Sequence, residues 1–329
     1  MKTRVHAPSA TSLRRLAAAL RRGELVAMPT ETVYGLAANA LDARACRRIF
    51  TAKRRPANDP LIVHILNVTA ARRLADFSAP ARALARAFWP GPLTLVLTKK
   101  PVVPDIVTSR QSTVALRSPA HPLARQLIAL AGVPLAAPSA NPFGYVSPTT
   151  AAHVLDGLEG RIAHVLDGGE CGVGLESTIV DVSQPGRAII LRPGAISAGD
   201  LRRALAKQGL RLRISTARRH AVLAPGMLPQ HYSPRTPLTL GRAPRSARAP
   251  QSNTGVIHWR KPARPQPTDA WLSPHGDVSE AAHSLYAVLR RMDVAGFDRL
   301  YCERAPVSAG PLGEAINDRL TRAATKTRR

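Results

Sequence analysis

Short apolar runs alternate with helical patterns along the first 210 residues, and this alternation limits the folds that the chain can adopt. The apolar runs have the length of buried strands, and we expect strands near residues 25–28, 61–65, 93–98, 113–117, 133–137, 162–166, 177–182 and 188–192. Apolar side chains recur at helical spacing elsewhere, and we expect helices near residues 11–22, 43–53, 69–76, 80–88, 121–131, 150–158 and 198–208. This mixture predicts an α/β domain over residues 1–210. Since only a short turn at Pro185-Gly186 separates the last two strands, we expect that pair to be antiparallel and the twisted sheet to be mixed.

The composition changes after Gly209. Residues 211–251 are rich in Arg, Pro, Ala and Ser and show no sustained apolar period, which is typical of a linker. A second, small α/β domain with a basic tail is predicted over residues 252–329. In this domain we expect strands at 256–259 and 300–302 and helices at 278–292 and 312–324.

The chain has 329 residues and carries 47 Lys and Arg against 21 Asp and Glu, which gives a formal net charge of +26. Such an excess favours polyanionic partners, for example nucleotides or RNA. A basic, solvated surface explains the same charge equally well.

The three cysteines, Cys46, Cys171 and Cys302, are far apart, and no CxxC pair occurs. This spacing indicates neither a zinc knuckle nor a disulfide framework, and it fits a reducing cytoplasm. No apolar segment of the signal-peptide type follows Met1, and no stretch of about 18 apolar residues predicts a membrane span. We therefore expect a cytoplasmic protein without a membrane partner.

Polar side chains gather at residues 29–36, directly after the first strand expected in the sheet. Their sequence, Pro-Thr-Glu-Thr-Val-Tyr-Gly-Leu, places hydroxyls, a carboxylate and a phenol between a proline and a glycine. Polar side chains contribute little to the packing of a buried strand. They are typical of a ligand site at the carboxyl end of a strand, so we expect a site here.

Lys53 and Arg55 lie at the end of the helix expected at 43–53, just before Pro56. Two cations so close together can converge on phosphates, Arg through a bidentate fork and Lys as a point charge. Cations at a helix C-terminus also interact favourably with the helix dipole, so the pattern by itself leaves both interpretations open. His64 ends the next expected strand. It is either a ligand contact or a core histidine whose hydrogen bonds are satisfied within the protein.

Five further polar residues lie at the ends of expected elements. Ser139 and Asn141 follow the strand at 133–137, where they form either a simple turn or a ligand contact. Arg117 and Arg192 each end an otherwise apolar strand, and a buried guanidinium there needs an anion. Ser147 precedes the helix at 150–158, whose N-terminus suits a phosphate.

Several common nucleotide and metal motifs are absent from the sequence. There is no G-x-x-x-x-G-K-[ST] sequence, and no G-x-G-x-x-G opens a helix after a strand, so a nucleotide would have to be held without those loops. There is no H-E-x-x-H sequence and the ten histidines are scattered, so we expect no metal held by protein side chains.

Taken in order, these motifs resemble the Sua5/YrdC family of threonylcarbamoyl-AMP synthases in its longer, two-domain form. The matching segments are residues 29–36, Lys53-x-Arg55-Pro56, residues 60–64, Ser139-Ala140-Asn141, residues 176–181 and Arg192-Pro193-Gly194. Residues 225–227 and 231–234 are similar to the linker that folds over the active site in this family. The resemblance implies a mixed-sheet YrdC-like catalytic domain, a linker at 211–251 and a small Rossmann-like C-terminal domain.

The resemblance implies that L-threonine, bicarbonate or CO2, and ATP react to give threonylcarbamoyl-AMP and pyrophosphate. The product would pass to the machinery that installs the t6A modification of tRNA. Threonine would lie near Thr32, His64, Arg117, Ala137 and Ser177, with Arg117 on its carboxylate. ATP would lie near Lys53, Arg55, Asp59, Thr113, Ser139, Asn141, Ser147, Arg192, His231 and Tyr232.

Positioning and electrostatic stabilisation would supply most of the catalysis, because negative charge builds on phosphoryl oxygens in such a reaction. The resemblance implies that Lys53 and Arg55 are catalytic, that Mg2+ is held mainly by the phosphates, and that no dedicated protein base is needed. Two positions depart from the family pattern. Asp59 stands where Asn is common, and Leu228-Pro229-Gln230 replaces a segment that usually contains Lys and Tyr.

Two other functions are compatible with parts of the sequence. The charge of +26 suits a non-catalytic protein that binds double-stranded RNA, although such a protein needs no threonine pocket. A carbamoyl-handling domain like that of hydrogenase-maturation proteins would normally come with acylphosphatase-like and zinc-finger sequences, which this chain lacks. The motifs favour the synthase over both.

Overall fold

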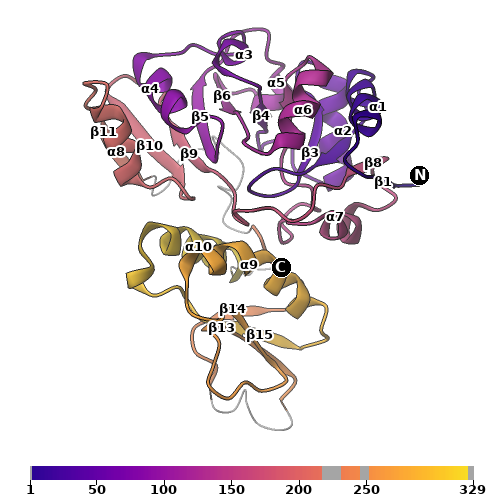
Figure 1. Cartoon of the computed structure of the whole chain (residues 1–329), viewed down its shortest axis with the longest axis vertical. Helices are drawn as coiled ribbons and strands as arrows, with labels where there is room; N and C mark the ends of the chain where they lie inside the picture. Colours follow the sequence, from indigo (N-terminus) through magenta and orange to yellow (C-terminus); the bar gives the residue numbers. More distant parts are fainter. Residues whose placement is uncertain (1, 217–230, 245–251, 325–329) are drawn as a thin grey trace.

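The computed structural model describes residues 2–216, 231–244 and 252–324, which form two α/β units (Figure 1). The strands of the first unit are β1 (Arg4–His6), β2 (Val26–Met28), β3 (Gly35–Asn39), β4 (Ile62–His64), β5 (Leu93–Thr98), β6 (Thr113–Arg117), β7 (Leu135–Ala136), β8 (His164–Leu166), β9 (Thr178–Asp181), β10 (Arg187–Arg192) and β11 (Arg213–Thr216). Its helices are α1 (Ala10–Arg21), α2 (Ala43–Lys53), α3 (Val68–Arg72), α4 (Ala79–Phe88), α5 (Asp105–Thr108), α6 (Pro122–Ala131), α7 (Ala151–Leu158) and α8 (Ala198–Ala206).

The strands of the first unit form one 11-stranded sheet in the order β1-β8-β2-β3-β7-β4-β6-β5-β9-β10-β11. Parallel and antiparallel pairs alternate irregularly across it, so the expected mixed sheet is confirmed. The strands β9 and β10 are antiparallel, as the short turn between them predicts. A mixed order of this kind brings residues from distant parts of the chain to one edge of the sheet.

Both faces of this sheet are covered by helices. Along β2, Val26 and Met28 pack toward α1 and α6, whereas Ala27 packs toward the larger core that includes α2 and α4. This alternation follows from the two-residue period of a strand. A strand buried on both faces reads as a continuous apolar run, which is why the pattern predicts β2 correctly.

The second unit is a small parallel α/β unit. Its elements are β12 (Leu238–Leu240), β13 (Thr254–Arg260), β14 (Asp269–Ser273), α9 (Val278–Asp293), β15 (Arg299–Cys302), the 3₁₀ helix η2 (Val307–Ala309) and α10 (Gly310–Ala324). The strands pair in parallel in the order β12-β15-β13-β14. This arrangement confirms the expected small Rossmann-like α/β unit.

The structure contains five strands that the sequence pattern does not predict. Two of them, β11 and β12, lie inside the range 211–251, where we expected no regular structure. The edge strand β11 is largely exposed and takes its form from pairing with β10, so it shows no apolar period. The others are β1, β3 and β14, of which β3 is built from small residues that carry little strand signal.

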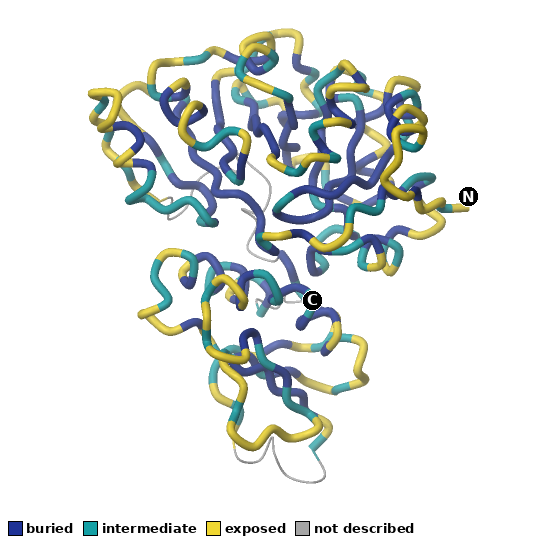
Figure 2. The backbone as a smooth tube through the Cα atoms, viewed as in Figure 1, coloured by how far each residue is buried: buried dark blue, intermediate teal, exposed yellow. Residues whose placement is uncertain are grey.

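The two units share a continuous apolar core. The cluster around α9 and β15 also contains Val33, Val146 and Leu175 of the first unit and Tyr232 from the connecting segment. Figure 2 shows the buried stretches at the centre of each unit and along the segment that runs between them. The second unit therefore packs against the motif at 29–36, through Val33, and against Val146 and Leu175.

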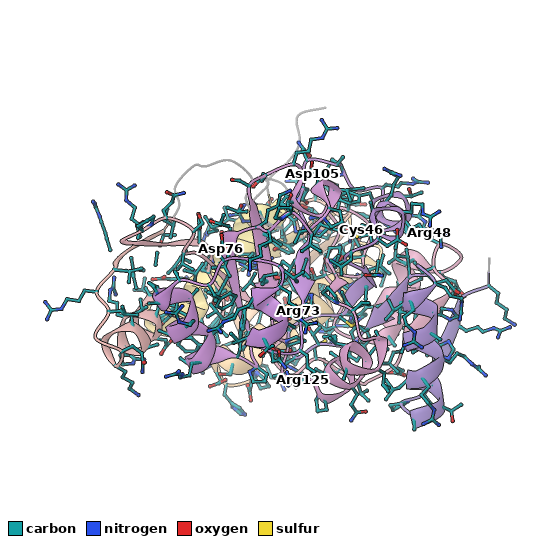
Figure 3. The ribbon with its side chains drawn as sticks, turned by 90° about the horizontal axis from the view of Figure 1, so that it is seen from above. Cys46, Arg48, Arg73, Asp76, Asp105 and Arg125 are labelled. Atoms are coloured by element: carbon teal, nitrogen blue, oxygen red, sulfur yellow. The ribbon has the colours of Figure 1, made fainter. Side chains whose placement is uncertain are left out.

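The charged side chains are mostly peripheral. Arg48, Arg73 and Asp76 are exposed, whereas Cys46 is buried in the core of the first unit; Figure 3 labels all four. All three cysteines are buried and unpaired. Within the described ranges, no helix combines the length and the apolar character needed to cross a bilayer.

Candidate active site

A small cavity of about 40 Å³ lies between the first unit and the connecting segment at His231 and Tyr232. Nine of the residues expected in the site line it: Thr32, Arg55, His64, Arg117, Ala137, Ser139, Arg192, His231 and Tyr232. The sequence analysis did not assign the other lining residues, which are Thr30, Val33, Gly35, Ile62, Pro138 and Glu176.

Parallel pairing of β4 and β6 brings His64 and Arg117 together. The two residues are register partners at the carboxyl ends of these strands. His64 is 3% exposed, and its Nδ1 has no hydrogen-bond partner among the described residues. Burial and the positive charge of Arg117 lower the pKa of His64 to about 3. A neutral imidazole therefore faces the cavity.

The guanidinium of Arg117 holds the polar motif in place. Its Nη2 lies 2.8 Å from Glu31 Oε1, and its Nη1 donates to Thr32 Oγ1 at 2.9 Å. Burial raises the pKa of Glu31, but the charge of Arg117 outweighs it, and the net shift is downward. The anion that a buried strand-end arginine requires is thus supplied by the chain itself.

Arg55 reaches the cavity because α2 stops just before it. Arg54 adopts the left-handed conformation with φ 53°, which ends the helix and turns the chain back. Arg55 Nη2 then lies 2.9 Å from Asp59 Oδ2, and both side chains are buried. Asp59 does not line the cavity, so its position favours a role as the partner of Arg55 over the expected ATP contact.

Lys53 does not line the cavity either. Its Nζ donates to the backbone oxygen of Ser139 at 2.6 Å and to that of Asn141. Burial, together with the nearby charge of Arg55, lowers its pKa well below the ordinary value. Lys53 therefore fixes the loop that carries Ser139, and the structure does not bring its ammonium group into the cavity.

Four other predicted residues do not line the cavity. Thr113 lies at the opposite end of β6 from Arg117 and pairs with Thr98. Asn141 donates through Nδ2 to the backbone oxygens of Pro142 and Tyr145, both at 2.8 Å. Asn141 thereby holds a backbone turn, whereas Asn141 Oδ1 and Thr113 Oγ1 are buried without a hydrogen-bond partner among the described residues.

The remaining two lie just behind the cavity wall. Ser147 Oγ donates to Glu176 Oε1 at 2.6 Å. Ser177 shares a hydrogen bond of 2.7 Å with Thr94 Oγ1 and accepts from Arg192 through both its hydroxyl and its backbone oxygen. Ser177 thereby sets the position of Arg192, which does line the cavity.

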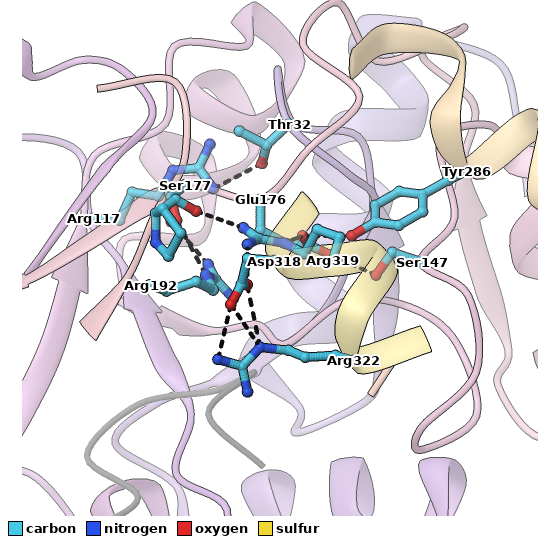
Figure 4. Close-up of polar contacts among 11 residues, drawn as sticks. Thr32, Arg117, Ser147, Glu176, Ser177, Arg192, Tyr286, Asp318, Arg319 and Arg322 are labelled. Carbon is cyan, nitrogen blue, oxygen red and sulfur yellow. Dashed lines mark hydrogen bonds and ion pairs between the residues drawn. The ribbon is translucent and has the colours of Figure 1, made fainter. Parts of the chain in front are cut away.

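Glu176 is the main residue that sequence reasoning missed. Its Oε2 accepts from Tyr286 Oη at 2.8 Å and from Arg319 Nε at 2.9 Å, and both donors belong to the second unit (Figure 4). Burial opposes ionisation, but Arg319 and then Arg192 lower the pKa of Glu176 to about 2. Its place beside Ser177, in the segment 176–181 that matches the family pattern, is the local signal that could have identified it.

The described part of the expected lid, His231 and Tyr232, closes one side of the cavity. The Tyr232 ring stacks on the Tyr286 ring, and their centroids are 5.8 Å apart. The centroid of the His231 ring lies 4.1 Å from the centroid of the Tyr232 ring. His231 Nδ1 and Tyr232 Oη are buried and have no hydrogen-bond partner among the described residues. Residues 225–230 of the same expected segment lie outside the described residues.

Carboxylates near the cavity do not form a metal site. Glu31 is paired with Arg117 and Glu176 with Arg319. In the described part of the chain, no group of three or more His, Cys, Asp or Glu side chains could hold a metal ion. The side chains present therefore do not fit a protein-ligated Mg2+.

Two family models match the chain. The Sua5/YciO/YrdC model, described as "Telomere recombination", matches residues 18–194. A second model, described as "Threonylcarbamoyl-AMP synthase, C-terminal domain", matches residues 196–325. Together they cover both units described above.

Relatives match over nearly the whole length. A threonylcarbamoyl-AMP synthase of Pyrococcus abyssi is 39% identical over 313 residues, which are 92% of this chain and 91% of that protein. One of Bacillus subtilis is 38% identical and covers 94% of this chain and 91% of that protein. The crystal structure of P. abyssi Sua5 complexed with L-threonine superposes with a TM-score of 0.87 at 37% identity over 98% of both chains. The chain therefore belongs to the Sua5/YrdC family and has the two-unit architecture of its Sua5 members.

Proposed function

We propose that the protein is an L-threonylcarbamoyladenylate synthase, which forms threonylcarbamoyl-AMP and pyrophosphate from L-threonine, bicarbonate or CO2, and ATP. Family membership and the names of the relatives support this function. The observation that carries it is the convergence of three buried guanidinium groups on one cavity. Arg55, Arg117 and Arg192 are 6%, 4% and 3% exposed. Guanidinium groups can donate paired hydrogen bonds to carboxylates and phosphates, which suits a substrate with several negative groups.

Threonine would occupy the part of the cavity near β4 and β6. Arg117 would hold its carboxylate, and Thr32 and the neutral His64 would accept or donate hydrogen bonds. Ala137, which also lines this part, leaves room for a side chain through its small size. Glu31 lies next to Arg117 and would keep that guanidinium oriented before substrate arrives. The amine of threonine must be neutral when it attacks CO2.

ATP would occupy the side of the cavity near Arg55, Ser139 and Arg192. The carbamate oxygen of threonine would attack the α-phosphorus in line, and pyrophosphate would leave. Arg55 and Arg192 would stabilise the negative charge that builds on the phosphoryl oxygens. His231 Nδ1 and Tyr232 Oη, which lack partners among the described residues, would supply contacts from the lid. We propose no direct phosphate contact for Lys53, which is bonded to two backbone oxygens.

Mg2+ would arrive with the phosphates of ATP, since the side chains here do not provide a cage for it. The adenylate product would pass to the enzymes that transfer threonylcarbamoyl to tRNA. We propose a cytoplasmic site of action, where such enzymes and tRNA meet. Direct contact with RNA through the basic surface is a further part of this proposal.

The test is pyrophosphate release by the purified full chain. We expect release to require ATP, L-threonine and bicarbonate together, and threonylcarbamoyl-AMP to accumulate in equal amount by chromatography. Serine in place of threonine is the matched substrate control. Release that continues without threonine or without bicarbonate would contradict the proposed reaction. Tight binding of double-stranded RNA with no release of pyrophosphate would favour the non-catalytic alternative.

A further inference from the structure

We propose that Tyr286 of the second unit is a positioning residue for the reaction, because its ring is the surface against which Tyr232 packs when it closes the cavity. The inference rests on the proposed function, since it concerns the same cavity. It gives the second unit a task that the motifs of the first unit leave open. Tyr286 does not line the cavity and would act through Tyr232, which does.

The helix α9 carries Tyr286 on its buried face. Ala282, Leu285, Tyr286 and Leu289 follow the helical spacing i, i+3, i+4, i+7, and all four are buried. Tyr286 adds a hydroxyl to this apolar face, and the hydroxyl donates to Glu176 Oε2 of the first unit at 2.8 Å (Figure 4). Burial and the charge of Glu176 raise the pKa of Tyr286 well above its ordinary value, so the hydroxyl keeps its proton. This bond fixes the ring across the interface between the units.

Tyr232 packs against this fixed ring. The rings of Tyr232 and Tyr286 are stacked, with their centroids 5.8 Å apart and their planes at 23°. Aromatic pairs attract each other at this separation. Arg319, also from the second unit, places its Cζ 5.4 Å from the centroid of the Tyr232 ring, where a cation is attracted to the ring. The second unit therefore supplies two contacts to one side chain of the connecting segment.

The backbone of Tyr232 depends on such support. Its φ is 65°, in the left-handed region that residues with a Cβ rarely adopt. An unfavourable conformation persists only where the surrounding structure imposes it. The N–H of His231 donates to the backbone oxygen of Arg322 at 3.4 Å, and the N–H of Ser233 donates to that of Gly144 at 2.8 Å. These bonds hold the flanking residues, whereas the ring contacts hold the side chain of Tyr232.

The position of Tyr232 determines which polar groups the cavity offers to ATP. Tyr232 Oη and His231 Nδ1 are buried, belong to residues that line the cavity, and have no hydrogen-bond partner among the described residues. Without the ring of Tyr286, a smaller fraction of the molecules would hold Tyr232 in the closed position. A ligand that binds only this fraction has its apparent affinity reduced in proportion. Saturating ATP restores the closed position, so KM should rise while kcat changes little.

The experiment compares Tyr286→Leu and Tyr286→Phe in the full chain, with pyrophosphate release as the assay. Tyr286→Leu should raise KM for ATP about three- to tenfold, as for loss of a stacked aromatic pair. Its kcat should change by less than about twofold. Tyr286→Phe keeps the ring and loses only the bond to Glu176, which still accepts from Arg319 and Ser147, so it should recover most of the affinity. A merely structural role would lower the amount of folded enzyme, and hence kcat, without raising KM.

Arg290 provides a matched control in the same helix and interface. It is buried, and its Nη2 donates to the backbone oxygen of Val146 at 2.6 Å across the units. Its Cζ lies 4.8 Å from the centroid of the Tyr145 ring. In the part of the chain that the structure describes, Arg290 makes no hydrogen bond, ion pair or ring contact with Tyr232 or Glu176. Arg290→Met should therefore lower thermal stability without raising KM for ATP.

A double variant tests whether Tyr286 acts through Tyr232. Tyr286→Leu added to Tyr232→Ala should raise KM for ATP no further than Tyr232→Ala alone, because the ring that Tyr286 supports has gone. Four results would each overturn the inference: an unchanged KM in Tyr286→Leu, equal rises in Tyr286→Leu and Arg290→Met, no recovery in Tyr286→Phe, or additive effects in the double variant.

Calorimetry with a non-hydrolysable ATP analogue separates this inference from the proposed reaction. Tyr286→Leu should weaken binding of the analogue by the same factor by which it raises KM. If wild type binds the analogue but releases no pyrophosphate, the proposed reaction is refuted, and the affinity of Tyr286→Leu for the analogue still decides the inference. If wild type does not bind the analogue, both are refuted.

Discussion

Glu31 Oε1 lies 2.8 Å from Arg117 Nη2, so the guanidinium expected to receive the carboxylate of threonine already has a carboxylate beside it. Glu31 belongs to the polar motif after β2, and Arg117 ends β6. This pair fixes the motif against the strand end before any ligand binds. Threonine must therefore share Arg117 with Glu31, or displace Glu31 from it.

Arg117→Ala should weaken threonine binding about ten- to a hundredfold, since a hydrogen bond between charged groups contributes roughly 1.5–3 kcal/mol. ATP affinity should change little, because Arg117 lies on the threonine side of the proposed site. Isothermal titration with each ligand measures both effects. Arg125→Ala, which removes an arginine that does not line the cavity, is the control. A loss of ATP affinity with threonine binding intact would mean that the two subsites are reversed.

Arg55→Ala should reduce the rate of threonylcarbamoyl-AMP formation about ten- to a hundredfold, because a charge that stabilises the phosphoryl oxygens is lost. The variant also leaves Asp59 buried without its partner, and breaking a buried pair costs about 3–5 kcal/mol of stability. Adding Asp59→Asn removes the stranded charge, so the double variant should regain thermal stability but not activity. Full turnover in the double variant would exclude Arg55 from the chemistry.

Tyr232→Ala should lower the amount of threonylcarbamoyl-AMP that accumulates, because the ring closes the cavity and stacks on Tyr286. A closed cavity keeps water from the labile adenylate. Tyr232→Phe keeps the ring and removes only the hydroxyl, so it should retain the protection and lose the proposed polar contact. Chromatography of product over time measures both variants. Identical accumulation in wild type and Tyr232→Ala would show that the ring does not protect the product.

Glu176 should make stability depend on acid pH. Its pKa falls from the ordinary 4.5 to about 2 in the folded protein, so the unfolded chain binds the proton more readily. The stabilisation is therefore complete above about pH 4.5 and is lost as the pH falls toward 2, by roughly 3 kcal/mol in all. Glu176→Gln should flatten the decline of the free energy of unfolding in this range. Urea unfolding at a series of pH values measures it, and curves of equal slope for both proteins would contradict the assignment.

The amino-acid sequence determined the α/β class, the mixed sheet and most of the cavity residues. Buried strands leave continuous apolar runs, and polar residues directly after such runs stand out locally, as His64 and Arg117 do. Side chains at the ends of β4 and β6 meet because parallel paired strands end at the same edge of a sheet. These features depend on short stretches of chain, so patterns in the sequence reveal them.

The tertiary structure alone decided how the charges are paired. Lys53 donates to Ser139 across 86 positions of the chain, and Arg319 to Glu176 across 143. Neither contact has a local pattern, because a buried cation is matched to whichever acceptor the packing of distant elements brings near it. For this reason the sequence could not reveal the contact of Lys53 with the loop at 139–141, and it assigned no role to Glu176 or Arg319. The energetic cost of burying an unpaired charge explains why each such cation has a partner in the folded protein.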